Sequence, residues 1–143
     1  MKKINIVLPL LLFTFAMSSA LAEPVVVVVN SSNTQSISLT DIRNIYLDKT
    51  TNWENGGKIV VYNLPADDEA ADLFASKALG MSARDAATAE SNRVITNAAR
   101  NPQQTKREAL VATIVARTPN AIGYLAKKKI VGKSGIRVLL TLE

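Results

Sequence analysis

The sequence predicts an α/β domain, with a mixed or parallel β-sheet flanked by helices. Residues 25–29 are five consecutive valines, and an unbroken β-branched run of this length is typical of a strand buried on both faces. Further along the chain, apolar stretches of strand length alternate with segments whose apolar residues recur at helical spacing. Strands joined through helices form right-handed crossovers, which require a parallel or mixed sheet.

Capping and stop residues set the predicted element boundaries. Ser38 or Thr40 can cap a helix in which Asp41 occupies the favourable first turn, and Gly80 is a typical helix stop. In chain order, we expect a strand at 25–29, a helix starting near Ser38 or Thr40, a loop at 48–57, a strand at 58–62, helices at 65–79 and 82–92, a short strand at 93–96, a helix at 105–116, and strands at 121–125 and 136–142. The loop holds Trp53, which either stacks on a ligand or covers the edge of the core.

The N-terminus has the pattern of a secretory signal peptide. Two lysines precede an apolar run at residues 4–17, and the small residues of a cleavage site follow at 20–22. The run is shorter than the roughly 20 residues that span a bilayer, so we expect no membrane anchor. Residues 1–22 are therefore predicted to be a signal peptide, and residues 23–143 a single domain in the periplasm.

The composition argues against most enzyme classes. The chain has no histidine and no cysteine, which removes the commonest general base and most of the usual zinc ligands. We therefore expect a protein that is not an enzyme, with no catalytic residues, no metal and no cofactor. The net charge is +5, falling to +3 without the two lysines of the signal peptide, and aromatic residues are few. Nucleic-acid binding is not expected from this composition.

The junction between the strand at 58–62 and the helix at 65–79 carries an acidic cluster. A strand that turns directly into a helix is a natural anion site, because free N–H groups and the positive end of the helix dipole face outward. Here the turn carries Asp67, Asp68 and Glu69, which would repel an anion by about 1 kcal/mol each in water at close range. A structural role at the helix start is the favoured interpretation, and contact with a cation or metal is the alternative.

Four segments together resemble a known family. They are VVVVVN at 25–30, SLTDIRNIYLDKTTNW at 38–53 with KIVVYN at 58–63, NRVITNAARNP at 92–102 and TPNAIGYL at 118–125. In this order they resemble the phosphate ABC transporter substrate-binding-protein-like family of the type II periplasmic binding proteins, which are solute receptors of ABC importers. By length the chain looks like a short, single-domain variant built around about one of the usual two lobes.

The resemblance implies both a fold and a function. It implies one lobe of a type II periplasmic binding protein, and an exported receptor that binds a small phosphate-like anion for ABC transport or sensing, with an ABC permease as partner. The family places hydroxyl and glycine residues in the turn that here carries the acidic cluster. A second hypothesis is therefore a ligand-free domain that acts through protein contacts at the cell envelope. A one-lobe domain could also build a cleft by pairing with a second copy, which would make a homo-oligomer.

Candidate ligand residues follow the predicted strands. Open α/β sheets bind ligands at the carboxyl ends of their strands, and residues 31–34 and Asn63 would share one edge if the first two strands are parallel. Arg93 and Arg100 could each supply a charge-assisted fork to an anion. The alternatives are ordinary turn hydrogen bonding for the loop residues and a surface ion pair for each arginine. The predicted ligand-binding residues are Ser31, Ser32, Asn33, Thr34, Asn63, Arg93 and Arg100.

Overall fold

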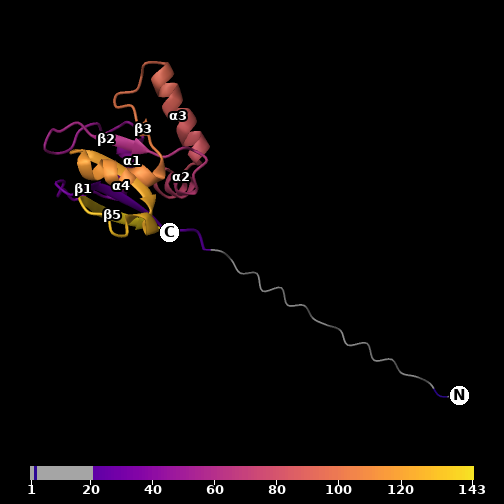
Figure 1. Ribbon diagram of the computed structural model, residues 1–143. Coiled ribbons are helices and arrows are strands. Elements are labelled where there is room, and N and C mark those ends of the chain that lie inside the picture. Colours follow the sequence, from indigo (N-terminus) through magenta and orange to yellow (C-terminus); the bar gives the residue numbers. More distant parts are fainter. Residues whose placement is uncertain (1, 3–20) are drawn as a thin grey trace.

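A computed structural model describes residues 2 and 21–143 of the chain, and most of the predicted signal peptide lies outside these residues. Figure 1 shows the elements along the chain. They are β1 (Val25–Asn30), α1 (Leu39–Tyr46), β2 (Val60–Asn63), α2 (Glu69–Phe74), the π-helical turn η1 (Ala75–Leu79), α3 (Ala83–Ile95), β3 (Gln104–Thr105), α4 (Glu108–Arg117), β4 (Ala121–Ala126), the 3-10 turn η2 (Lys127–Ile130) and β5 (Ile136–Leu142).

The strands form one mixed sheet in the order β3-β2-β4-β1-β5. β2 runs parallel to both β3 and β4, whereas β1 lies antiparallel between β4 and β5. The predicted mixed sheet flanked by helices is thus confirmed. β1 runs in the opposite direction to β2 and β4. The carboxyl end of β1 therefore lies at the other end of the sheet from the carboxyl ends of β2 and β4.

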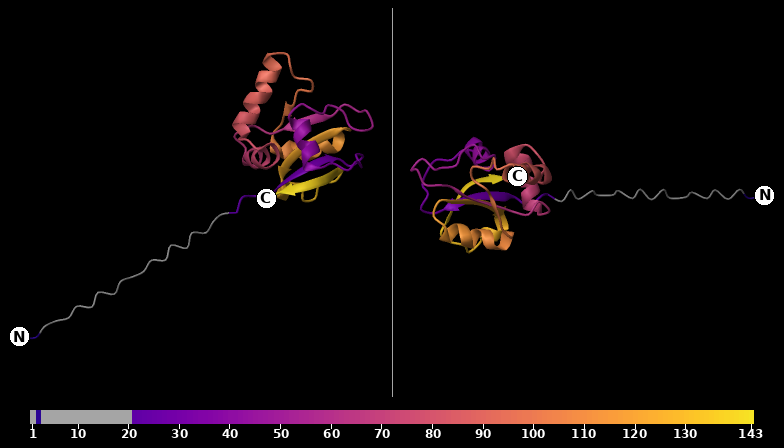
Figure 2. Two further views of the ribbon diagram at one scale, coloured as in Figure 1. Left: turned by 180° about the vertical axis from the view of Figure 1, so that it is seen from behind. Right: turned by 90° about the horizontal axis from the view of Figure 1, so that it is seen from above.

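Helices cover both faces of this sheet. Viewed from above in Figure 2, α4 lies on one side of the strands, while α1, α2 and η1 lie on the other. β1 sits between these layers, and its five valines are at most 1% exposed. Full burial of a valine side chain is worth about 1.5–3 kcal/mol, so this central strand is a main source of stability. Trp53 is also buried and donates from Nε1 to the carbonyl of Asn120 at 2.9 Å, so it covers the edge of the core.

Several helix boundaries differ from the prediction. α2 starts at Glu69 rather than at residue 65, because Asp68 is its N-cap and accepts a hydrogen bond from the N–H of Ala70 at 2.9 Å. α3 starts as predicted after Ser82 but continues to Ile95, so the predicted short strand at 93–96 is wrong.

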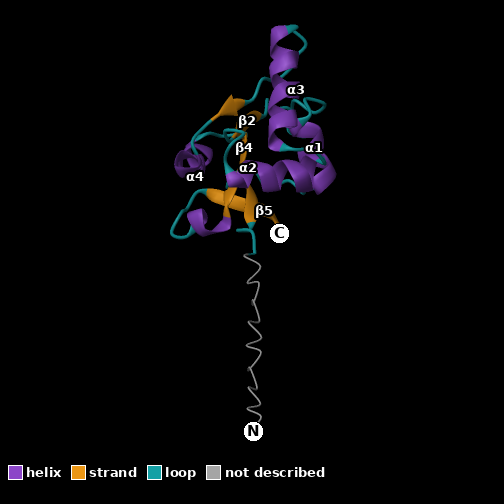
Figure 3. Cartoon of the chain, turned by 90° about the vertical axis from the view of Figure 1, so that its right-hand side faces the viewer, coloured by secondary structure: helices purple, strands orange, loops and turns teal. Residues whose placement is uncertain are grey.

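α3 projects from the body of the domain, as Figure 3 shows. Ala83 is its one buried residue within the described part of the chain. α4 begins at Glu108 rather than at residue 105, because Gln104 and Thr105 pair with β2 instead. In the described residues no helix has both the length and the apolar character needed to cross a membrane.

Candidate binding groove

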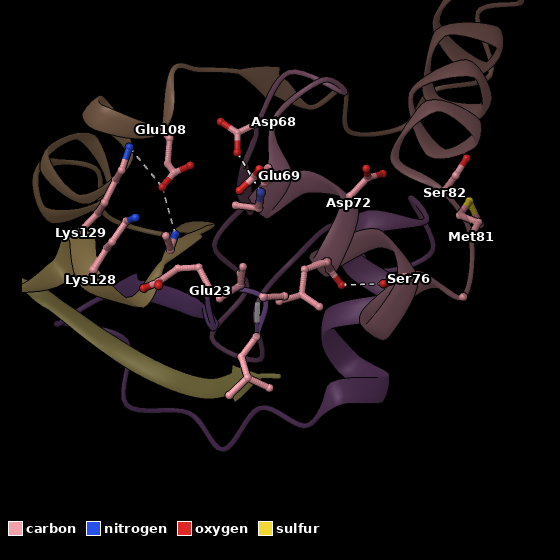
Figure 4. Close-up of a pocket in the computed structure, with 17 residues that line it drawn as sticks. Glu23, Asp68, Glu69, Asp72, Ser76, Met81, Ser82, Glu108, Lys128 and Lys129 are labelled. Atoms are coloured by element: carbon pink, nitrogen blue, oxygen red, sulfur yellow. Dashed lines mark hydrogen bonds and ion pairs between the residues drawn. The ribbon is translucent and has the colours of Figure 1, made fainter. Parts of the chain in front are cut away.

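An open groove of about 1230 Å³ lies at the end of β4, beside the first turn of the helix that follows β2. Its walls come from the N-terminal turns of α2 and α4, the turn between η1 and α3, η2, and residues 21–25 (Figure 4). Leu21 and Ala22 of the last segment belong to the predicted signal peptide, so the expected cleavage would remove them from the groove. The lining combines apolar side chains, among them Val25, Leu73 and Met81, with charged groups. Since the carboxyl edge of parallel strands is where open α/β sheets bind ligands, this groove is the candidate functional site.

Five carboxylates and two lysines give the groove its charge. They belong to Glu23, Asp68, Glu69, Asp72, Glu108, Lys128 and Lys129. Lys129 is in part neutralised, because its Nζ lies 3.4 Å from Oε1 of Glu108. The same Oε1 accepts a hydrogen bond from the backbone N–H of Ala126 at 3.2 Å, which fixes Glu108 against the end of β4. The groove therefore carries a net negative charge, although the whole chain is basic.

The carboxylates of α2 are held by the local structure of its first turn. Asp68 caps the helix, and Asp72 accepts a hydrogen bond from the N–H of Ala83 at 3.4 Å, which ties α2 to the start of α3. Glu69 and Asp72 lie in the first turn and complement the helix dipole. The expected structural role at the helix start is thus supported for Asp68. Its side-chain oxygen accepts from the N–H of Ala70, one of the N–H groups that an anion would need.

Asn63, a predicted ligand residue, forms the centre of an internal network. Its Oδ1 accepts hydrogen bonds from the N–H of Leu64, at 2.8 Å, and from the hydroxyl of Tyr124, while its Nδ2 donates to Oε1 of Gln103 at 2.6 Å. The backbone N–H of Gln103 in turn donates to Glu90 at 2.8 Å. All the polar atoms of the Asn63 side chain therefore have partners within the protein.

Tyr124 links this network to the aromatic core. Its ring stacks on Phe74 with centroids 3.9 Å apart, and Tyr46 packs edge-on against both rings. Burial raises the pKa of the Tyr124 hydroxyl well above the usual value; a hydrogen bond from the Leu64 N–H opposes the shift, and the negative charges of Asp68 and Glu108 add to it. The hydroxyl therefore stays protonated and acts as a donor to Asn63.

Residues 31–34 lie at the other edge of the sheet. β1 is antiparallel to β4, which is parallel to β2, so the condition for a shared edge with Asn63 is not met. Ser32 and Asn33 instead make local turns. Ser32 donates to Oδ1 of Asn30 at 2.7 Å, and Oδ1 of Asn33 accepts from the N–H of Gln35 at 3.0 Å. Ser31 and Thr34 are exposed in the same loop.

The two predicted arginines also lie away from the groove. Arg93 on α3 forms an ion pair with Glu90, with 2.8 Å between Nη2 and Oε2, as the surface ion-pair alternative expected. Arg100 makes no such pair among the described residues, and its guanidinium donates to the carbonyl of Lys49 at 3.3 Å. Its backbone N–H donates to the carboxylate of Asp48. Asp48 is buried and has a positive φ, whereas from the sequence this residue was expected only to lie in a loop. None of the seven predicted ligand residues lines the groove.

The fold of the chain matches three solved structures at low sequence identity. An ABC-type phosphate transport receptor from Vibrio cholerae matches with a TM-score of 0.55 at 15% identity, over 82% of this chain and 45% of that one. A possible phosphate binding protein from Planctomyces limnophilus matches with a TM-score of 0.60 at 14% identity, over 82% and 42%. A putative phosphate ABC transporter substrate-binding protein from Clostridium perfringens, solved with bound phosphate, matches with a TM-score of 0.54 at 20% identity, over 73% and 40%.

The fold is that of one lobe of a periplasmic binding protein. This chain spans less than half the length of each of the three solved chains. No family model matches the sequence, and no curated protein matches it either. The resemblance found in the sequence is therefore confirmed at the level of fold.

Several groove residues were not predicted from the sequence. Glu108 is the first residue of α4, and Lys128 and Lys129 lie in the turn after β4. These two segments are distant in sequence from α2. They meet at the groove because β4 lies parallel beside β2, which brings the ends of both strands to one edge. The basic run at 127–129 was visible in the sequence, but the identity of its neighbours depends on strand order.

Proposed function

We propose that this chain is an exported binding domain that acts through protein contacts at the cell envelope. The observation that carries the proposal is the charge of the groove, in which five carboxylates face two lysines and, after the expected cleavage, the α-ammonium group of Glu23, which leaves the groove negative. A phosphate ion placed there would meet net repulsion, Oδ1 of Asp68 already takes the N–H of Ala70, and the side-chain atoms of Asn63 have partners within the protein. A partner segment that presents Lys or Arg beside apolar side chains matches this lining.

A second candidate function is a receptor for a small phosphate-like anion, which delivers it to an ABC permease or takes part in sensing. The three phosphate-receptor neighbours favour it, since they share the fold of this lobe. In this case the ligand residues would come from one end of the sheet only, either from the loop at 31–34 or from the region of Asn63, because these two lie at opposite ends of the strands. The export expected from the N-terminal sequence is common to both candidates.

Calorimetry with anions separates the two candidates. The purified exported protein is titrated with phosphate, sulfate and molybdate, and we expect no binding heat up to millimolar concentrations. Micromolar binding that is lost in Ser32→Ala or Arg93→Ala would establish the receptor and overturn the proposed protein-contact role. Weak heat that both variants retain would still argue against a receptor site at these residues.

Site-specific photo-crosslinking tests the protein-contact role directly. A photoreactive residue at Ser76, which lines the groove, should form one adduct of defined mass in the source cells. Asp72→Lys in the same chain should remove the adduct, because it reverses a groove charge while α2 keeps its cap. The matched control places the photoreactive residue at Ser91, an exposed position on α3. Equal labelling from Ser76 and Ser91, or none from Ser76, would contradict the proposal.

A further inference from the structure

The segment that joins β4 to β5 lies beside α4. It spans residues 127–135 and crosses β1, because β4 and β5 pair with the two sides of that strand. At its start, Nζ of Lys129 lies 3.4 Å from Oε1 of Glu108, the first residue of α4. At its end, a Cβ added to Gly135 would lie 2.9 Å from Cβ of Ala116, in the last turn of α4. The segment and α4 therefore form one layer on the same side of the sheet, which we call the α4 layer, about 15 Å long.

The α4 layer carries exposed positive charge. Residues 109–142 contain six Lys and Arg and no Asp or Glu. Glu108 is the one acidic residue of the layer, and its carboxylate already pairs with Lys129. The helices α1 and α3, which carry acidic residues, lie on the other side of the sheet (Figure 3). The exposed cations of the layer that form no ion pair within the described residues are Arg117, Lys127, Lys128 and Lys133. The layer therefore presents four cations with no free carboxylate among them.

Two apolar side chains are exposed in the same layer as these cations. Val131 is 80% exposed in the turn between Lys129 and Lys133, and Leu110 on α4 is 51% exposed. Segments that lie on membrane surfaces combine lysine and arginine with apolar side chains that enter the headgroup region. The cores of protein interfaces differ, because they gather aromatic and apolar side chains and contain few lysines. The α4 layer therefore has the composition of a lipid-binding surface.

We infer that the α4 layer binds the surface of an anionic phospholipid bilayer. Lys127 lies near the start of α4, whereas Lys133 and Arg117 lie near its end, so the cations are spread over the length of the helix. A layer of lipid phosphates can meet all of them at once, whereas one small anion cannot. Each Lys or Arg near an anionic membrane surface strengthens binding by about fivefold. Val131 lies between these cations in the sequence and enters the headgroup region.

The lipid contact and the groove are different surfaces with a common border. Lys128 and Lys129 belong to the α4 layer and also line the groove, so a bound bilayer would lie next to the groove. The inference goes beyond the proposed role of the groove, and it holds or fails independently, because vesicle binding is measured with no protein partner present. If both are correct, the partner in the groove is a protein that also lies at the membrane surface.

Sedimentation of the exported protein with vesicles tests the lipid contact. We expect binding to vesicles of mixed phosphatidylglycerol and phosphatidylcholine, and binding weaker by at least about tenfold to phosphatidylcholine alone or in high salt. Lys127→Glu combined with Lys133→Glu should weaken binding to the mixed vesicles by at least about tenfold. The matched control is Lys77→Glu with Arg84→Glu, which makes the same change of net charge at exposed positions of η1 and α3 and should leave binding unchanged.

Three results would overturn the inference. The first is no binding of the unchanged protein to the mixed vesicles. The second is an equal loss of binding in both double variants, which would mean that net charge alone attracts the protein to lipid. The third is binding to polyglutamate in place of the vesicles, which would identify an acidic protein as the partner of these cations.

Tryptophan fluorescence tests whether Val131 enters the headgroup region. The sequence has a single tryptophan, the buried Trp53, so its emission is a constant background. The emission of Val131→Trp should shift to shorter wavelength when the mixed vesicles are added, because the indole leaves water. Ile95→Trp is the matched control, since Ile95 is 78% exposed on α3, and its emission should not shift. No shift in Val131→Trp, or the same shift in both variants, would refute the assigned face.

Discussion

Replacing Asn63 by alanine tests whether this residue holds the fold or a ligand. The substitution removes the acceptor of the buried Tyr124 hydroxyl and of the Leu64 N–H, and the donor to Gln103. A buried donor left without a partner costs about 1–3 kcal/mol, and the lost bond to Leu64 adds about 0.5–1.5 kcal/mol. Gln103 is only partly buried and can bond to water instead. We therefore expect the free energy of unfolding to fall by about 2–4 kcal/mol.

Urea unfolding followed by circular dichroism measures this loss. A decrease of that size lowers the midpoint by about 1–2 M for a domain of this length. Asn92→Ala is the matched control, because Asn92 is exposed on α3 and its side-chain amide makes no hydrogen bond with the rest of the described chain. It should change the stability by less than about 0.5 kcal/mol.

A double-mutant cycle with Tyr124→Phe isolates the shared hydrogen bond. Tyr124→Phe removes the donor, so adding Asn63→Ala to it should cost less than Asn63→Ala costs alone. The reasoning is refuted if Asn63→Ala leaves the stability unchanged, or if the two effects simply add. An unchanged stability combined with lost anion binding would instead indicate that Asn63 is a ligand residue.

Three other outcomes follow from the structure. Gly123→Ala should destabilise the domain by about 1–3 kcal/mol in urea unfolding, because the added methyl group would lie 3.0 Å from Cγ1 of Val111; equal stability would contradict this packing. Burial raises the pKa of Tyr46, so the folded state keeps its proton where the unfolded tyrosine ionises; stability should fall as the pH rises above about 10, less steeply in Tyr46→Phe, and parallel slopes would argue against this. Mass spectrometry of the exported protein should find its N-terminus at Glu23, since residues 21–23 are exposed and precede the first strand; a retained leader would disprove the expected cleavage.

The sequence predicted most elements where local chemistry decides them. The valine run of β1 and the apolar segments of β4 and β5 were identified because strands buried in a sheet contain such runs. Ser38 accepts a hydrogen bond from the N–H of Asp41, and Gly80 adopts the left-handed conformation at a φ of 70°. These caps depend on a few neighbouring residues, so their positions can be found without knowledge of the fold.

Strand direction and the end of α3 could not be predicted in this way. No local pattern records that β1 runs antiparallel to β4, so the sequence could not show that residues 31–34 lie away from Asn63. Val94 and Ile95 favour a strand by intrinsic propensity, yet they continue α3, which its Ser82 cap starts. The groove could not be predicted for the same reason. Its walls come from segments that are distant in sequence, and they lie side by side only because of the order of the strands in the sheet.

The position of β1 in the sheet sets the order in which the chain can fold. Its two neighbours, β4 and β5, lie at residues 121–142, so the first strand of the domain can pair only after nearly the whole chain is present. Contacts between such distant segments form slowly, and until they form, five consecutive valines remain without their partners. A chain still bound to the ribosome is thereby kept from folding too early, and a chaperone that covers the valine run would protect it during this interval.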